Sequence, residues 1–471
     1  MKTECNLNRL KFHPLLSRKV IAKLDGGNIT SDAGALLLRE VENRTHILKR
    51  LSQCFRDFRN SKRIEHTVEE LVKQRIYAIA MGYEDLNDHE ILRYDFLLGL
   101  LCDKVDPTGS NRKREIDKGK ATAGKSTLNR FELTPESCKD VSRYKKIVAV
   151  PEKIDDLLIT LFIESYKKPP EEIVLDLDAT DDPLHGSQEG RFFHGYYKGY
   201  CYLPLYIFCE EQLLCARLRT ADRDASDGSV EELERITTRL RQKWPHTRII
   251  IRGDSGFCRN TIMDWCEANQ IDYVLGLAKN NRLKGFISEE MIEAKNLYEQ
   301  TGQAARVFKD FSYQTVKSWS KERRVIGKAE HLQRGENPRF IVTSLKKTNW
   351  KGSSLYEKLY CARGEMENRI KEQQLYLFAD RTSTALMRSN QLRLYFSSFA
   401  YVLMQWLRQF ALTGTEMAEY QCATIRCKLF KIGAQVKISV RKIWISISQS
   451  YPFAEALEKI LAKLYQIPIR T

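Results

Sequence analysis

The sequence of 471 residues lacks both the paired cysteines and the long apolar runs that mark several protein classes. Its 12 cysteines are scattered singly, and the nearest two, Cys422 and Cys427, have no matching second pair. This spacing argues against a zinc ribbon or a thiol redox site and favours free thiols in a reducing compartment. The N-terminal residues MKTECNLNRLKFHPLL lack the apolar core of a signal peptide, and apolar stretches such as 399–407 are too short to span a membrane. We therefore expect a cytoplasmic protein without a membrane segment.

Basic residues outnumber acidic ones. Lys and Arg total 77 against 61 Asp and Glu, which gives a formal net charge of +16. Residues 112–125 hold six Lys or Arg and two acids, and residues 421–454 hold no Asp or Glu. Nucleic acid is the polyanionic partner that best fits this imbalance. We expect four basic side chains from these two segments to contact DNA phosphates: Lys113, Arg114, Lys437 and Arg441.

The hydrophobic patterns divide the chain into three regions. Residues 1–165 are mainly helical, as in 67–82, where a Thr67/Glu70 capping box precedes an apolar period of 3.6 and Gly82 follows it. We interpret this region as a DNA-binding domain. Residues 391–471 form a basic C-terminal region in which the pattern predicts a long helix, a pair of strands and a last helix.

The middle region, residues 166–390, alternates between strands and helices. The predicted strands cover 172–178, 200–208, 213–219, 247–252 and 271–277, and the predicted helices cover 229–244, with a Ser229/Glu232 capping box, and 261–269. Three consecutive strands followed by alternating helix and strand are the order of a ribonuclease-H-like α/β domain. A β-rich insertion is expected at about 300–346. The fold class is therefore α/β, with a ribonuclease-H-like catalytic domain after a mainly helical N-terminal domain.

Three acidic residues stand where such a domain would place a metal site. Asp178 ends the first strand, Asp254 follows the fourth, and Glu367 lies on a later helix. Carboxylates from adjacent strand ends and a crossing helix can share two divalent cations in phosphoryl transfer, and oxygen ligands suit Mg²⁺ or Mn²⁺. Asp176 points the same way as Asp178 in an alternating strand, so either could be the first ligand. Each strand-end Asp could instead cap a turn.

A stripe of functional side chains surrounds the third acid. Tyr360, Arg363, Glu367 and Lys371 follow one another at steps of three, four and four, which places them on one face of a helix. An arginine, a lysine and an aromatic ring beside a carboxylate are suited to holding phosphate next to a metal ligand. The alternative is a solvated face with a Glu367–Lys371 ion pair.

These motifs together resemble a known family. LDLDATDD, RGDSGF and the Y-x2-R-x3-E helix resemble the three catalytic motifs of DDE transposases from bacterial insertion sequences. The chain as a whole is similar to the insertion-sequence thirteen-eighty branch, through GYEDLNDHEILRYD, STLNRFE and HGYYKGYCYLPLYIF. Related families carry Lys seven residues after the Glu; here position 374 is Gln, and Lys371 stands one turn earlier.

The resemblance implies a cut-and-paste transposase, an endonuclease and strand transferase of DNA recombination. Asp178, Asp254 and Glu367 would be its catalytic and metal-binding triad, with two Mg²⁺ or Mn²⁺ ions. It would bind terminal inverted repeats and target DNA, act as a homodimer in the synaptic complex and associate with the nucleoid. Trp319 is a candidate for stacking on a flipped base, with core packing as the alternative. The other candidate function is a DNA-binding protein derived from a transposase without remaining catalysis.

One further motif resembles a nucleotide site only in its letters. Residues 119–126, GKATAGKS, fit the phosphate-loop pattern G-x4-G-K-[ST]. Such a loop needs a buried strand before it, yet the preceding residues are almost all polar. We expect no nucleotide cofactor here.

Overall fold

The computed structural model describes residues 9–469 and divides them into two compact units. One unit runs up to Ala149 and resumes at Phe399, and the other covers Val150–Ser398. The contacts between residues place the boundaries of these units at 149/150 and 398/399, whereas the sequence predicted boundaries at 165/166 and 390/391. The contacts also group the N- and C-terminal regions into one unit. The long helix α14 (Met387–Leu407) crosses the second boundary. The roles of the three predicted regions stay predictions.

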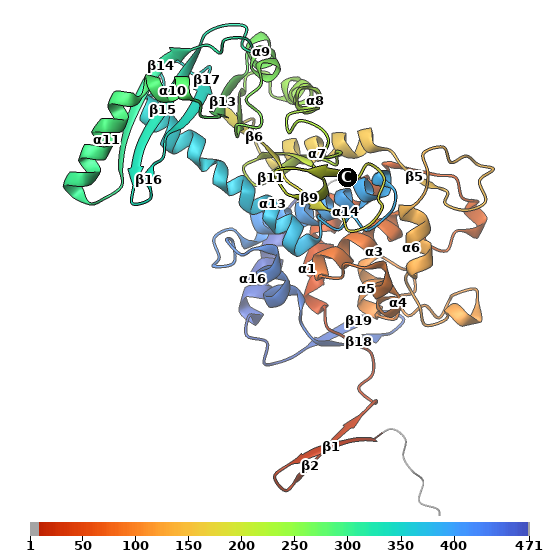
Figure 1. The fold of residues 1–471 in the computed structure, drawn as a ribbon. Helices are drawn as coiled ribbons and strands as arrows, with labels where there is room; N and C mark the ends of the chain where they lie inside the picture. The colour runs from red at the N-terminus through yellow and green to blue at the C-terminus, as the bar shows by residue number, and fades with distance from the viewer. Residues whose placement is uncertain (1–8, 470–471) are drawn as a thin grey trace, which may run out of the picture. The chain divides into compact units, whose positions relative to one another are not determined.

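A nine-stranded mixed sheet organises the unit 150–398 (Figure 1). Its strand order is β11-β10-β6-β12-β13-β17-β15-β14, with the short β16 paired to β15. Strands β11, β10 and β6 pair antiparallel, whereas β6, β12 and β13 run parallel. The five strands that the sequence predicted correspond to β6 (Glu172–Ala179), β10 (Leu205–Cys209), β11 (Gln212–Arg217), β12 (Arg248–Gly253) and β13 (Asp272–Leu277).

The prediction of one strand over 200–208 is wrong in one respect. The segment forms two strands, β9 (Gly199–Tyr202) and β10, which belong to different sheets. β9 pairs with β8 (Phe192–His194) and β7 (Asp182–Pro183) in a small three-stranded sheet. The apolar pattern continues across the break, because Leu203 is as deeply buried as the strand residues on either side.

The expected β-rich insertion consists of strands that extend the main sheet. β17 (Arg339–Thr343) pairs with β13, and β15 (Arg323–Leu332) and β14 (Ala305–Tyr313) follow it outward. Helix α11 (Ser288–Thr301) lies along β14 and β15 (Figure 1). The other described elements of this unit are α7 (Pro151–Ser165), α8 (Ser229–Lys243), α9 (Asn260–Ala268), α10 (Asn281–Phe286), β16 (Gly335–Glu336), α12 (Gly352–Ser354) and α13 (Gly364–Leu377).

The helix predicted at 229–244 is present as α8, but its predicted cap is wrong. Gly228, with φ of 74°, occupies the N-cap position, and Ser229 is buried within the first turn. Glycine is favoured at a left-handed position because it has no Cβ. Helix α8 and its neighbours cover a core formed by Leu175, Leu177 and Ile251 of the central strands.

Helices form most of the regular secondary structure of the other unit. Helix α3 (Val68–Met81) has the complete Thr67/Glu70 capping box and ends at Gly82, with φ of 95°. Near the start of the described chain lies a strand pair that the sequence analysis missed. The remaining elements are β1 (Arg9–Leu15), β2 (Arg18–Lys23), β3 (Ile29–Thr30), α1 (Leu36–Thr45), α2 (Ile47–Ser52), β4 (Phe55–Asp57), α4 (His89–Leu92), α5 (Phe96–Leu101), α6 (Lys125–Glu132), β5 (Ile147–Ala149), α15 (Cys422–Ile425), β18 (Ala434–Ile438), β19 (Ile443–Ile447) and α16 (Ala454–Tyr465).

Early and late segments of the chain pack together within this unit. β18 pairs with β3, and Arg426 donates hydrogen bonds to the carbonyls of Ile79 and Ala80 at the end of α3. A Cβ on Gly34 would lie only 1.6 Å from the Leu429 carbonyl oxygen, so only glycine permits this approach. Within residues 9–469, no helix combines the length and the apolarity that a membrane span requires.

Candidate active site

Two of the three predicted carboxylates leave the sheet at the same edge. β6 and β12 run parallel, and Gly253 pairs with Leu177. Asp178 and Asp254 each follow this pair by one residue, so both stand at the carboxyl end of adjacent strands. The Gly256 backbone N–H donates to Asp254 Oδ1 at 2.8 Å. A Cβ on Gly256 would lie 2.9 Å from that oxygen, which explains the glycine two residues after the aspartate.

Asp176 has a different environment from Asp178. Its carboxylate is 2% exposed and forms a two-pronged ion pair with Arg252, which stands opposite it on β12. Arg252 also donates to the Leu359 carbonyl. Asp178 instead lines an open cleft. Of the two residues that the sequence left as alternatives, the geometry favours Asp178 as the site residue and gives Asp176 a structural ion pair.

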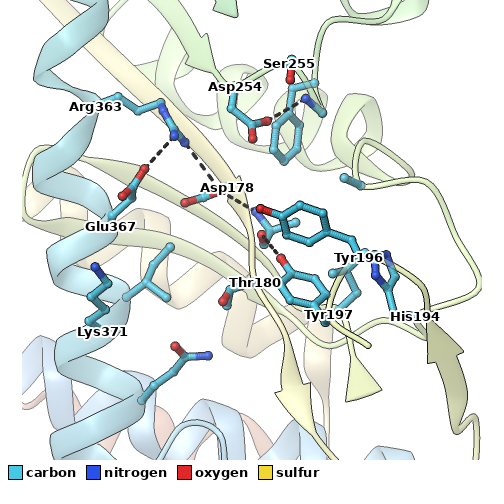
Figure 2. Close-up of a pocket in the computed structure, with 17 residues that line it drawn as sticks. Asp178, Thr180, His194, Tyr196, Tyr197, Asp254, Ser255, Arg363, Glu367 and Lys371 are labelled. Carbon is cyan, nitrogen blue, oxygen red and sulfur yellow. Dashed lines mark hydrogen bonds and ion pairs between the residues drawn. The ribbon is translucent and has the colours of Figure 1, made fainter. Parts of the chain in front are cut away.

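The third carboxylate comes from helix α13. Glu367 and Arg363 line the same cleft as Asp178 and Asp254, and Lys371 lies one turn beyond Glu367 (Figure 2). Arg363 stands between two of the acids: Nη2 donates to Glu367 Oε1 at 2.6 Å, and Nη1 lies 3.6 Å from Asp178 Oδ1. The ion pair of Glu367 is therefore with Arg363, which precedes it.

Tyr360, the first member of the predicted stripe, does not line the cleft. The backbone is not one regular helix, because Leu355–Tyr360 forms a π-helical turn and Cys361–Arg363 a 3₁₀ turn before α13 begins. Tyr360 ends that π-helical turn and lies outside the cleft lining, with its ring against Tyr356. Its hydroxyl covers Gly276, where a Cβ would lie 2.5 Å away. Burial raises its pKa.

The cleft has a volume of about 690 Å³ and a wall of aromatic residues that the sequence analysis did not assign to the site. His194, Tyr196 and Tyr197 lie on the hairpin between β8 and β9, on the side of the cleft away from α13 (Figure 2). Tyr197 donates to the Ala179 carbonyl at 3.3 Å, whereas Tyr196 is 82% exposed. Three aromatic rings in a four-residue turn, HGYY, are the signal that could have indicated them.

The electrostatics of the cleft favour a bound cation. Burial raises the pKa of Asp178 to about 7, Arg363 opposes this rise, and Asp254 and Glu367 add to it. The donor atoms are all carboxylate oxygens, which Mg²⁺ and Mn²⁺ prefer. Among the described residues, no three His, Cys, Asp or Glu side chains lie close enough together to bind a metal ion as they stand. The carboxylate oxygens of the site fit a divalent cation in their chemistry. Arg363 balances part of their negative charge.

Gln374 has a structural contact in place of the lysine found in related families. Its side-chain amide donates to the Asp181 carbonyl at 3.0 Å and to Asp182 Oδ1 at 3.1 Å. Burial raises the pKa of Asp182 well above its usual value, and a neutral amide donor suits that group. Lys371, exposed at the cleft, is the cation on this face of the helix.

The remaining predicted DNA contacts fall into two kinds. Lys113, Arg114, Lys437 and Arg441 are exposed, as phosphate contacts require. Trp319 is only 7% exposed and packs edge-on against Tyr313, with ring centroids 5.7 Å apart. Its position is accounted for by the alternative of core packing.

The phosphate-loop letters at 119–126 belong to a different structure. Residues 115–117 before them form a 3₁₀ turn and not a buried strand. The Lys125 backbone N–H, at the start of α6, donates to Glu90 Oε1 at 2.8 Å. A carboxylate of the protein thus occupies the place where a nucleotide phosphate would bind.

Comparison with known proteins identifies the family. The model of the family described as transposase DDE domain group 1 matches residues 12–469. The chain belongs to this transposase family. A search of curated proteins found no match. Among solved structures, a cryo-EM structure of a piggyBac transposase synaptic complex with hairpin DNA is similar at 10% identity and a TM-score of 0.40, covering 85% of this chain and 79% of that chain.

Membership in the DDE transposase family supports a DNA nuclease and strand transferase class of enzyme. The matched region includes both units and every residue of the cleft.

The two aspartates of β6 should respond oppositely to neutralisation. Asp176→Asn leaves the buried Arg252 without its counter-charge, and we expect the free energy of unfolding to fall by about 3–5 kcal/mol. For Asp178, the raised pKa means that the ionised form is disfavoured in the folded state, a cost that is fully present above pH 7. Asp178→Asn should therefore be at least as stable as the wild type at pH 8.

Urea denaturation at pH 8 measures both effects. Asp176→Leu combined with Arg252→Met is the matched control, because replacing both members of a buried pair by apolar groups restores most of the stability. If Asp178→Asn were the strongly destabilised variant, the assignment of the two aspartates would be reversed.

Proposed function

We propose that this protein is a metal-dependent DDE transposase that cleaves DNA at terminal inverted repeats and transfers the freed end into target DNA by a cut-and-paste route. The observation that carries the proposal is the convergence of Asp178, Asp254 and Glu367 on one cleft from two adjacent strand ends and a separate helix. The strand order β11-β10-β6-β12-β13 supports a ribonuclease-H-like core. In this order, β11, β10 and β6 pair antiparallel, and β6, β12 and β13 pair parallel. The GYEDLNDHEILRYD and HGYYKGY segments support the insertion-sequence thirteen-eighty branch.

Two Mg²⁺ or Mn²⁺ ions are the proposed cofactors. Proteins of the DDE transposase family generally use divalent metal ions. Asp178, Asp254 and Glu367 would hold the ions, which when bound activate the attacking oxygen and stabilise the leaving oxygen of a phosphodiester. We infer that Asp254 is held in position by the Gly256 N–H, and that Glu367 is oriented from α13 by Arg363.

Arg363 is the proposed phosphate-positioning residue. Its Nη1 is buried and lies 3.6 Å from Asp178 Oδ1, an ion pair that is too long for a hydrogen bond. A buried donor gains from a hydrogen-bond acceptor, and we propose that a ligand supplies it. A phosphate oxygen between Asp178 and Arg363 would accept this bond, and Lys371 would lie beside the same strand.

The physiological setting follows from the same proposal. The protein would act on double-stranded DNA at the nucleoid in the cytoplasm, with no membrane association. Bringing two element ends together suggests a homodimer in the synaptic complex. If the chain binds such ends but does not cleave them with either metal, the alternative of a DNA-binding protein derived from a transposase is favoured.

Neutralising one carboxylate should abolish cleavage but preserve binding. The substrate is a duplex that carries the inverted repeat flanking the coding region, incubated with Mg²⁺ or Mn²⁺. We expect Asp254→Asn and Glu367→Gln to lower the nicking rate by at least about 100-fold, since even outer-shell changes at metal sites cost about 10–100-fold. EDTA should remove the activity. Undiminished nicking by either variant would contradict the mechanism.

Arg363 should matter more for cleavage than for binding. At saturating DNA, Arg363→Ala should lower the cleavage rate by about 100- to 1,000-fold, the cost of removing one donor to a developing charge. Its Kd for the DNA end should change by less than about threefold. Lys371→Ala, which removes an exposed cation of the same helix face, is the control and should have a smaller effect on the rate. An equal loss of binding and cleavage in Arg363→Ala would favour the alternative, in which this stripe is a solvated helix face.

A further inference from the structure

A second cleft lies wholly within the mainly helical unit, and nearly half of its lining residues are Lys or Arg. It has a volume of about 240 Å³. Its walls come from residues 59–66, from helix α6 and from the loop 143–147 that leads into β5. Six of its lining residues are cations: Arg59, Arg63, Arg130, Arg143, Lys145 and Lys146.

Most of these cations have no counter-charge in the protein. Arg59 pairs with Asp57 at 2.7 Å, and the one acid in the lining, Glu65, pairs with Arg112 outside it. In the part of the chain that the structure describes, the other five basic side chains form no ion pair with a carboxylate. Gathering like charges around one cleft is unfavourable unless an anion neutralises them.

An exposed aromatic ring links two of the guanidinium groups. Tyr144 is 57% exposed, with the guanidinium carbon of Arg130 5.6 Å and that of Arg143 5.1 Å from its ring centroid. Contacts of this kind hold arginine side chains in place without using their N–H donors. The donors of both arginines therefore stay available for phosphate oxygens.

The backbone of the cleft is fixed in a demanding conformation. Lys145 has φ of 56°, a left-handed value that a non-glycine residue adopts at a cost of about 1–3 kcal/mol. Strand β5, which follows, pairs with β4, and Phe58 N–H donates to the Lys146 carbonyl at 2.8 Å. Phe55 of β4 packs on Phe131 of α6 at a centroid distance of 5.1 Å. The surrounding structure thus holds the three walls together.

We infer that this cleft binds the phosphate backbone of double-stranded DNA, separately from the carboxylate cleft. The inference rests on the proposed function, which makes duplex DNA the polyanion. Each strand of a duplex presents a phosphate about every 3.4 Å of the helix axis, so one strand can engage several of these cations.

The salt dependence of DNA binding tests this inference. The variant Arg130→Gln/Arg143→Gln removes two exposed cations, and each phosphate contact contributes about 0.9 to the slope of log K against log salt. We expect the slope to fall by about 2 and the Kd at 0.1 M salt to rise by about 10- to 100-fold. The charge-matched control is Lys49→Gln/Lys459→Gln, two exposed helix lysines of the same unit, and it should keep the wild-type slope.

Further variants separate charge from structure. Arg130→Lys/Arg143→Lys keeps both charges and should keep most of the slope, which a purely structural role would not explain. An unchanged slope, an equal fall in the lysine control, or a loss confined to RNA duplexes would overturn the inference. If the wild type binds but never cleaves, the proposed activity fails while the slopes still decide the role of this cleft.

Discussion

The parallel pairing of β6 with β12 is the constraint on which the candidate active site depends. It places Leu177 opposite Gly253, so that the next residue of each strand, Asp178 and Asp254, leaves the sheet at the same edge. A shift of this register by one residue would turn one of the two carboxylates to the other face of the sheet. The buried Asp176–Arg252 ion pair joins the same two strands two residues earlier, and it reinforces the register from within the core.

The charge arrangement in the cleft follows from this backbone geometry. Two carboxylates at one sheet edge and a third from α13 raise the pKa of Asp178, and Arg363 offsets part of that cost from between the acids. The ionised carboxylates therefore lower the stability of the folded state. Such a cost is common where catalysis requires concentrated charge. The cleft of the helical unit shows the opposite imbalance, with cations that few acids neutralise. Under the proposed function, the two clefts would bind different parts of one DNA ligand: the reacting groups with their metal ions in one cleft and the phosphate backbone in the other.

Much of the central fold could be predicted because its strands and helices have clear periods. The residues 172–178 and 247–252 became β6 and β12, and the Thr67/Glu70 capping box is present in full. The other features depend on contacts between segments that are far apart in the sequence. Only the structure distinguishes Asp176 from Asp178, since the distinction depends on Arg252 from another strand. The stripe from Tyr360 onward assumed one regular helix, but Tyr360 ends a π-helical turn and does not line the cleft. Periodicity could not reveal that Tyr196 and Tyr197 line the carboxylate cleft, or that the basic cleft forms. Each depends on contacts between segments that are distant in the sequence.

The position of bound manganese would show whether Asp178, Asp254 and Glu367 form one metal site. Crystals of the full chain with a DNA end and Mn²⁺ would give anomalous scattering at each ion. We expect Mn²⁺ to be bonded to carboxylate oxygens of Asp178, Asp254 and Glu367. The bonds should be roughly 2.0–2.2 Å long, as for oxygen ligands of small divalent cations. Asp176 should still be paired to Arg252. Manganese bound by Asp176, or bound only outside this cleft while the DNA is cleaved, would contradict this expectation.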